Sequence, residues 1–259
     1  MPHSHSLQSD LNAALQITET ASVISLRHFN SALQIVTKDD ESPVTIADHE
    51  TEQAIRAQLK QQFPGDGIFG EEYGAQGLDS DRIWVVDPID GTRSFICGIP
   101  LFGMLLALVE NGQPLLGIIR LPALDQVYAG ATGLGATLNG VAIAVSDVTR
   151  LSDAMLFINE GEKIHADHPA VFDRLCKAGK LRRLSYDCQP HALLASGKVD
   201  AVVDFDLKPY DFMALAPVVQ AAGGVITDWS GEKLTLQSDG RVVSAATPEL
   251  HAEVLALLA

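Results

Sequence analysis

At 259 residues with 47% hydrophobic content, the chain is long enough to fill one large core or two closely packed ones. A formal charge of −15 at pH 7 argues against nucleic acid as a partner, because phosphate backbones are bound by surplus lysine and arginine. No apolar run reaches the roughly 18 residues of a membrane span, and the N-terminus lacks a signal-peptide pattern, so we expect a cytoplasmic protein with no membrane partner.

Two amphipathic helices and two buried strands are predicted before residue 90. Apolar residues recur at helical spacing over 11–29 and again over 48–63, where Asp48 is expected to be the N-cap. The short apolar segments 68–70 and 83–86 are predicted to be strands. Each strand is followed directly by carboxylates, and ligands commonly bind at strand ends in α/β sheets.

Asn-Gly pairs predict two antiparallel hairpins in the middle of the chain. One joins residues 102–109 to 114–119, and the other joins 126–130 to 141–145. After residue 150, strand-like apolar runs alternate with helical patterns, as in an α/β arrangement. The strands are predicted at 154–158, 199–205 and 224–228, and the helices at 168–178, 190–196, 210–222 and 248–259.

Neither a linker nor an internal repeat separates the two parts of the chain. We therefore expect one unit, residues 1–259, in which an N-terminal α+β half (about 1–150) packs against a C-terminal α/β half (about 151–259). In the second half, Pro217 removes a hydrogen bond from the predicted helix 210–222 and is expected to kink it.

Acidic residues follow the two predicted N-terminal strands. Asp87 and Asp90 flank Pro88, whose fixed φ favours an extended exit that lets Asp90 turn back toward Asp87. Two carboxylates about 4 Å apart would repel by about 4 kcal/mol at an effective dielectric of about 20, and a divalent cation removes that repulsion. Glu71 and Glu72 follow the preceding strand, so the expected ligands are oxygens, which point to Mg²⁺ or Mn²⁺ rather than Zn²⁺.

The segment Gly91-Thr92-Arg93-Ser94 comes next and opens onto a new element. Its backbone N–H groups can bind an anion, which would put a phosphate beside the metal ligands. Thr92 could orient an attacking water, cap the following helix, or do both. Taken alone, aspartates beside proline and glycine more often only cap a turn, and Asp211, at the start of a predicted helix, is more often an ordinary N-cap.

Three ordered motifs resemble the signatures of the inositol monophosphatase family. They are Gly70-Glu71-Glu72, the segment from Trp84 to Thr92, and the segment from Asp211 to Pro217 that closes on Ala222-Gly223-Gly224. The resemblance spans essentially the whole chain and implies an α/β (α+β) fold, the layered α-β-α-β-α sandwich of the inositol monophosphatase and fructose-1,6-bisphosphatase type. It also implies a metal-dependent phosphatase, usually a homodimer, that acts on a small phosphorylated metabolite with two or three Mg²⁺ ions, or Mn²⁺, in each site.

By position, the resemblance implies roles for individual residues. The implied metal ligands are Glu71, Asp87, the carbonyl of Ile89, Asp90 and Asp211. The implied catalytic residues, which align the attacking water, are Glu71, Thr92 and Asp48. Supporting positions fall to Lys38 and Glu72. The implied contacts with the phosphate and the rest of the substrate include Asp90, Gly91, Thr92, Arg93 and Asp211.

Arg93, directly after the Gly-Thr pair, resembles the histidinol-phosphatase branch of the family. Histidinol phosphate carries an ammonium and an imidazole, so its pocket should offer carboxylates beyond the phosphate site. The candidates are Asp187 and Asp204, for which surface solvation is the competing interpretation. The segment Cys188-Gln189-Pro190-His191 replaces the aromatic-rich stretch associated with that branch, and it leaves the roles of Cys188 and His191 open.

The expected reaction is hydrolysis of histidinol phosphate to histidinol and phosphate by metal-activated water, a step of histidine biosynthesis. A phosphatase acting on inositol 1-phosphate or on 3′-phosphoadenosine phosphate is the alternative within the family. A protein that binds metal and a phosphorylated metabolite without catalysis is the alternative from another class, although the intact set of carboxylates argues against it.

Overall fold

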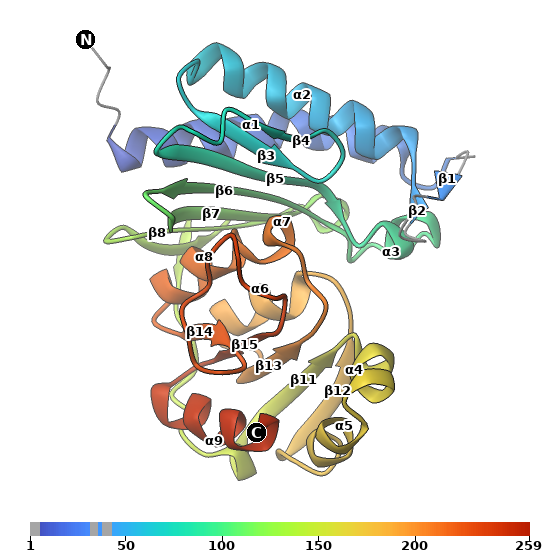
Figure 1. Cartoon of the computed structure of the whole chain (residues 1–259), viewed down its shortest axis with the longest axis vertical. Helices are drawn as coiled ribbons and strands as arrows, with labels where there is room; N and C mark the ends of the chain where they lie inside the picture. Colours follow the sequence, from blue (N-terminus) through green and yellow to red (C-terminus); the bar gives the residue numbers. More distant parts are fainter. Residues whose placement is uncertain (1–5, 32–35, 38–42) are drawn as a thin grey trace.

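The computed structural model describes residues 6–31, 36–37 and 43–259 and arranges them in alternating helical and sheet layers (Figure 1). Two long N-terminal helices cover one face of a large sheet, and shorter helices lie between that sheet and a smaller one. Further helices cover the outer face of the smaller sheet. This order of layers confirms the predicted α-β-α-β-α sandwich.

The N-terminal helices are α1 (Leu7–His28) and α2 (Ile46–Gln62). Thr45 caps α2, and the Asp48 carboxylate accepts a hydrogen bond from the Thr45 N–H at 2.8 Å, which completes a capping box. The prediction that Asp48 is itself the N-cap was therefore wrong, because Asp48 lies three residues further into the helix. At that position its side chain is completely buried and accepts a hydrogen bond from Thr92, beside which the candidate site forms.

The large sheet has the strand order β10-β9-β8-β7-β6-β5-β3-β4. Its strands are β3 (Gly67–Gly70), β4 (Gly74–Gln76), β5 (Arg82–Asp90), β6 (Gly103–Glu110), β7 (Gln113–Leu121), β8 (Gln126–Ala131), β9 (Gly135–Leu138) and β10 (Val141–Ile143). The predicted strands 68–70 and 83–86 are confirmed, and they form the parallel pair β3 and β5. One face of the sheet packs on α1 and α2 around the buried Trp84 and Ile55.

The first predicted hairpin is confirmed, since a turn at Asn111 joins β6 and β7. The second was wrong in its partners. Asn139 lies in the turn between β9 and β10, whereas β8 pairs with β9. Strand β9 escaped prediction because it is only four residues long and begins Gly135-Ala136, two residue types that are depleted in strands. Outside the large sheet and the smaller one, β1 (Val36–Thr37) pairs with β2 (Pro43–Val44). Short 3₁₀ helices occur at Pro122–Leu124 and Leu151–Asp153.

The smaller sheet has the strand order β12-β11-β13-β15-β14. Its strands are β11 (Met155–Asn159), β12 (Leu181–Ser185), β13 (Ala201–Asp204), β14 (Val225–Asp228) and β15 (Val242–Ala245), and its outer helices are α4 (Gly161–Asp167), α5 (Pro169–Leu175) and α9 (Pro248–Leu258). Three of these strands match predicted ones. The sequence pattern did not indicate β12 because it is an exposed edge strand, Leu-Arg-Arg-Leu-Ser, without a buried face.

The middle layer consists of α6 (Gln189–Ala195), α7 (Pro209–Phe212) and α8 (Leu215–Ala221). The prediction of one helix over 210–222 with a kink at Pro217 was wrong about where the helix breaks, because it is interrupted at 213–214. A proline ring clashes with the helical carbonyl four residues earlier, which here belongs to Met213. Pro217 itself lies in the first turn of α8. Backbone N–H groups in a first turn have no acceptor within the helix, so the missing N–H of proline removes no hydrogen bond there.

Helix α8 packs directly on β7 and β8 at two glycines. A methyl group on Gly117 would overlap the carbonyl of Ala214, and one on Gly130 would lie 2.6 Å from the Cα of Val218. The helix and the sheet therefore approach each other more closely than a side chain at either glycine would permit. This contact holds the middle layer, which carries part of the site, against the large sheet.

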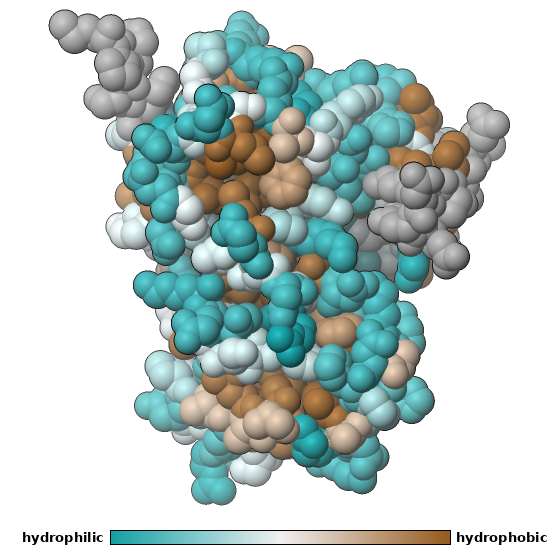
Figure 2. Space-filling model, viewed as in Figure 1, coloured by the Kyte–Doolittle hydropathy of each residue, from teal (hydrophilic) through white to brown (hydrophobic). Residues whose placement is uncertain are grey.

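The face of the molecule in Figure 2 is mainly hydrophilic, with apolar patches over the large-sheet layer and near the C-terminal end. Among the residues that the structure describes, none of the helices combines the length and apolarity needed to cross a bilayer.

Replacing Gly130 with alanine is expected to lower the free energy of unfolding by about 1–3 kcal/mol, because the added methyl group pushes α8 away from β8. Urea denaturation measures this change. Gly65→Ala is the matched control, since nothing lies within 4 Å of a methyl group at that position. A loss for Gly130→Ala no larger than the control's would contradict the close approach of helix and sheet.

Candidate active site

Strand β5 carries two of the predicted metal ligands at its end. Opposite β6, Asp87 pairs with Leu105 and Asp90 with Gly103, so β5 accommodates one extra residue between the two aspartates. Such a bulge bends the strand and re-aims side chains, which brings both carboxylates to the same side. The Asp87 carboxylate also accepts a hydrogen bond from the Ile89 N–H at 3.0 Å, which orients it.

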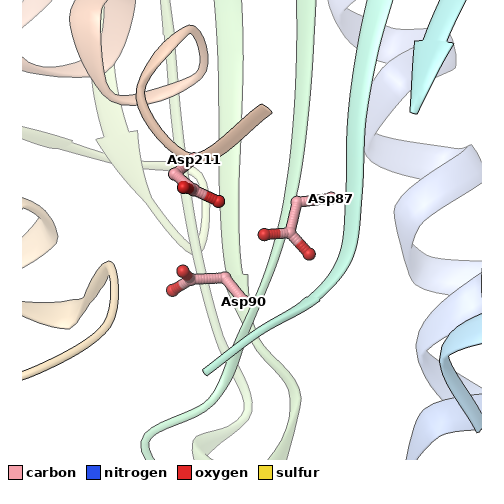
Figure 3. A group of neighbouring side chains, drawn as sticks. All are labelled: Asp87, Asp90 and Asp211. Carbon is pink, nitrogen blue, oxygen red and sulfur yellow. The ribbon is translucent and has the colours of Figure 1, made fainter. Parts of the chain in front are cut away.

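Asp211 reaches the same point from the middle layer. Its carboxylate accepts a hydrogen bond from the Lys208 N–H at 2.6 Å, and Lys208, not Asp211, is the N-cap of α7. One oxygen from each of Asp87, Asp90 and Asp211 lies within 4.8 Å of the others. Figure 3 shows the three carboxylates directed toward a common point. Two segments far apart in the sequence therefore build one acidic cluster.

The clustered carboxylates raise one another's pKa values. Burial raises the pKa of Asp87 well above its usual range, and the charges of Glu71, Asp90 and Asp211 raise it further. Burial and the neighbouring charges of Asp187 and Asp211 act in the same direction on the pKa of Asp90. Burial also raises the pKa of Asp211 to about 6. Ionised carboxylates at this separation repel by about 3–4 kcal/mol per pair at an effective dielectric of about 20, so the cluster favours bound cations.

The donor set fits a hard divalent cation. The described residues that line the pocket include neither histidine nor cysteine, so the donors are carboxylate and carbonyl oxygens, which Mg²⁺ and Mn²⁺ prefer. Glu71 lines the same pocket, and its N–H donates to the carbonyl of Val86, the residue before Asp87. Ile89, with a buried side chain, also lines the pocket. The residues with an implied ligand role are thus brought together.

Thr92 and Asp48 lie beside this cluster. The Thr92 hydroxyl is 3.2 Å from one Asp48 carboxylate oxygen and 3.2 Å from the Ile89 carbonyl, and it can donate to either. The other Asp48 oxygen accepts from the Thr45 N–H and hydroxyl. Burial raises the pKa of Asp48, and the hydrogen bonds from Thr45 lower it in part. Thr92 is therefore held at the pocket by the first turn of α2.

Gly91 allows Asp187 to approach the end of β5. Gly91 has φ 82, precedes α3 (Thr92–Ile96), and would bring any Cβ into the Asp187 carboxylate. Asp187 accepts a hydrogen bond from the Ser94 hydroxyl at 2.5 Å. Burial raises the pKa of Asp187 to about 6, although Ser94 and the charge of Arg93 lower it in part. Asp187 and Arg93 both line the pocket, as the sequence predicted for substrate contacts.

Asp204 also lines the pocket, but protein groups bind its carboxylate. It is 2% exposed and accepts hydrogen bonds from the Asn159 side chain at 2.7 Å and the Phe205 N–H at 2.9 Å. The oxygen that accepts from Asn159 also lies 3.1 Å from Nε2 of His191, whose Nδ1 faces Ser244. Its direct contact with substrate stays a prediction, and this geometry favours an indirect role. The fully buried His191 belongs to this network, which gives it a structural place that its sequence context did not indicate.

Among the described residues that line the pocket, four were not predicted, namely Glu160, Lys163, Asp206 and Leu207. Lys163 lies 2.9 Å from a Glu160 carboxylate oxygen and 3.1 Å from an Asp206 oxygen. Glu160 follows β11 directly, so the rule that ligands bind at strand ends could have indicated it. Its φ of 48 is unusual for a glutamate, and sequence alone gives no sign of that conformation.

Of the two predicted supporting residues, Lys38 and Glu72, the structure describes only Glu72. Lys38 lies outside the described residues. Glu72 does not line the pocket. Its N–H donates to Glu52 at 2.7 Å, and its side chain is almost fully buried 3.9 Å from Nδ1 of His49.

Comparison with known proteins agrees with this geometry. The model of the inositol monophosphatase family matches residues 6–259, and members of this family are generally metal-dependent. A histidinol-phosphatase from Chlorobaculum parvum is 38% identical and covers 90% of this chain and 91% of its own. The Arabidopsis thaliana protein named bifunctional phosphatase IMPL2, chloroplastic, is 38% identical over 92% of this chain and 72% of its own.

Solved structures agree as well. The structure of an inositol monophosphatase from Zymomonas mobilis superposes with a TM-score of 0.88 and 38% identity, covering 98% of this chain and 99% of that one. The match extends over both sheets and the helical layer between them, and therefore over the acidic cluster. The chain belongs to the inositol monophosphatase family and is a phosphoric monoester hydrolase.

Proposed function

We propose that the chain is a Mg²⁺-dependent phosphatase that prefers histidinol phosphate, which it hydrolyses to histidinol and phosphate. The assignment as a phosphatase rests on the convergence of Asp87, Asp90 and Asp211 beside Thr92, with one carboxylate oxygen of each within 4.8 Å of the others. Glu71 and the Ile89 carbonyl complete the expected ligand set for two or three Mg²⁺ ions, with Mn²⁺ as a possible substitute. When bound, the ions supply positive charge that neutralises the phosphoryl oxygens and the leaving oxygen and lowers the pKa of a nearby water.

The protein's own residues align the reacting water. Because the Thr92 hydroxyl donates its proton to Asp48 or to the Ile89 carbonyl, its oxygen is left to accept a hydrogen bond from the water. Glu71 accepts the other hydrogen of that water. The water oxygen forms the new bond to phosphorus while the ester P–O bond breaks on the opposite side. The attacking water gives up a proton to Glu71, and the leaving oxygen takes up one proton from solvent, so one water is consumed. Backbone N–H groups of Gly91 and Thr92 bind the phosphate.

The charge of the pocket favours a cationic phosphate ester. Among the described residues, eight carboxylates and two cationic side chains line it, so six negative charges of this set remain unmatched if all are ionised. Two divalent cations would leave two of these charges, which suits a substrate that carries an ammonium group. Asp187, beside Gly91, is the carboxylate that best fits this group. Inositol phosphate offers no cation, and 3′-phosphoadenosine phosphate brings further negative charge, so both fit the pocket less well.

The relatives support this substrate in part, since the Chlorobaculum protein is named a histidinol-phosphatase. The name of the Zymomonas structure points instead to inositol phosphate, which remains the second candidate. By family resemblance we further propose a homodimer located in the cytoplasm. A binding protein without catalysis would bind Mg²⁺ and phosphorylated metabolites but release no phosphate.

A substrate panel tests the proposal directly. Phosphate release is measured from histidinol phosphate, inositol 1-phosphate and 3′-phosphoadenosine phosphate, each with Mg²⁺ and with a chelator. We expect Mg²⁺-dependent release, with kcat/KM for histidinol phosphate at least about tenfold above the others, the effect of about 1.4 kcal/mol of extra binding. Equal or better turnover of inositol 1-phosphate would refute the substrate, and no release from any ester would refute the phosphatase.

Asp90→Asn tests the metal cluster. We expect Mg²⁺-dependent turnover to fall by at least about a hundredfold, while the metal-free protein gains about 1–3 kcal/mol of stability because one buried repulsive charge is gone. An asparagine oxygen can still accept the hydrogen bond that Asp90 takes from the Cys188 N–H at 2.6 Å, so the local fold should persist. Phosphate release and thermal unfolding with and without Mg²⁺ are the measurements. Asp79→Asn removes an exposed carboxylate as the control, and retained Mg²⁺-dependent turnover in Asp90→Asn would argue against a ligand role.

Asp187→Asn tests the ammonium contact. Loss of one charge-assisted hydrogen bond, about 1.5–3 kcal/mol, should raise KM for histidinol phosphate by roughly 10- to 100-fold. Hydrolysis of inositol 1-phosphate should change much less. Asp206→Asn is the control, because Asp206 lies at the same pocket but pairs with Lys163 and Lys208. Equal losses for both esters would show that Asp187 does not select the cationic substrate.

A further inference from the structure

Three buried charged residues lie along one face of α2. Asp48, Glu52 and Arg56 are spaced four residues apart, so they lie on the same side of the helix. Asp48 and Glu52 are fully buried, and Arg56 is 8% exposed. Asp48 contacts Thr92, but the proposed mechanism gives no role to Glu52 and Arg56. Charged residues are rarely buried to this extent without specific partners, so these two call for an explanation.

Glu52 binds the turn that follows β3. One of its carboxylate oxygens accepts from the N–H of Glu72 at 2.7 Å, and the other accepts from the N–H of Tyr73 at 3.3 Å. Arg56 donates to that second oxygen at 2.6 Å and also donates to the carbonyl of Gly74. The pair therefore binds the backbone of the three residues directly after Glu71.

The contact depends on Gly70. A Cβ on Gly70 would overlap the Glu52 carboxylate and would lie 2.9 Å from a guanidinium nitrogen of Arg56. On the other side, the Glu71 N–H donates to the carbonyl of Val86 at 3.2 Å. The backbone of Glu71 is thus held between β5, which carries Asp87, and the Glu52 carboxylate.

Stability alone is a weak explanation for this arrangement. Desolvation makes a buried ion pair little better than well-packed apolar residues, and often worse. What the pair does supply is fixed geometry, because charge-assisted hydrogen bonds to successive backbone N–H groups leave the turn little freedom.

We propose that Glu52 is a positioning residue that fixes Glu71 relative to Asp87 for metal binding and water alignment. Through Asp48 the same helix holds Thr92, so α2 sets the separation of the two groups that align the water. Glu52 touches neither substrate nor metal and acts through the backbone of residues 72 and 73. The inference rests on the proposed phosphatase function, in which Glu71 is a metal ligand.

The test is Glu52→Gln, which keeps the size of the side chain but replaces one acceptor oxygen by a donor facing other donors. We expect the Kd of the metal-free protein for Mg²⁺ to rise by about tenfold in calorimetric titration, a change of about 1.4 kcal/mol. At saturating Mg²⁺, kcat should fall by about tenfold or more while KM for the ester changes little, since the substrate contacts are intact.

Asp66→Asn is the matched control. Asp66 is a carboxylate of the large-sheet layer whose side chain is 13% exposed, and it accepts from Arg82 at 3.2 Å and Trp84 at 2.9 Å, but it is not bound to the turn after β3. Its loss should lower the unfolding temperature and leave the Kd for Mg²⁺ unchanged. If Glu52 were only structural, Glu52→Gln would behave in the same way, and that result would overturn the proposal.

Gly70→Ala gives a second test that leaves every charge in place. The added methyl group should displace the Glu52 carboxylate and raise the Kd for Mg²⁺ as Glu52→Gln does. If the wild type releases phosphate with Mg²⁺ but both variants bind Mg²⁺ with wild-type affinity, the positioning role is refuted and the proposed function stands. If the wild type itself shows no Mg²⁺-dependent phosphate release, the proposed function fails first.

Discussion

Repulsion among the closely spaced carboxylates of Asp87, Asp90 and Asp211 is the constraint on which the rest of the site depends. One oxygen of each lies within 4.8 Å of the others, and burial raises the pKa of all three. Without cations, the protein would lower its free energy by binding protons or by moving these groups apart. The fold resists the second response with a bulge in β5, a hydrogen bond from the Lys208 N–H to Asp211 at the start of α7, and a firmly bound turn after β3.

The two sheets contribute different parts of the pocket. The large sheet and the short helix after it supply Asp87 and Thr92, which belong to the metal and water site. Strands β11, β12 and β13 of the smaller sheet run parallel, and the chain after β11 and β12 supplies Glu160 and Asp187. Loops at these strand ends can change without disturbing β5. That separation is consistent with one fold serving relatives whose names give different substrates.

Contiguous motifs were the most predictable part of the site. Asp87 and Asp90 follow a strand and flank a proline, and Glu71 follows its parallel neighbour, so their proximity could be argued from strand ends alone. Asp211 could be linked to them only by family resemblance, because its approach depends on the packing of the middle layer. Glu160 was missed because its left-handed backbone arises at the junction of β11 and α4 and leaves no mark in composition. The layer order was predictable, whereas edge strands and helix breaks depended on tertiary packing.

The buried carboxylates of the described chain differ in how completely protein donors satisfy them. Asp204 has Asn159, His191 and a backbone N–H around it, and Glu52 has an arginine and two backbone N–H groups. Asp87, Asp90 and Asp211 each accept one backbone N–H, from Ile89, Cys188 and Lys208 respectively. Each hydrogen bond to a carboxylate favours its charged form, so Asp87, Asp90 and Asp211 receive less of this stabilisation than Asp204 and Glu52. A divalent cation would supply the compensating charge, and this difference separates a candidate metal cluster from the acidic turn that the same residues suggest in sequence.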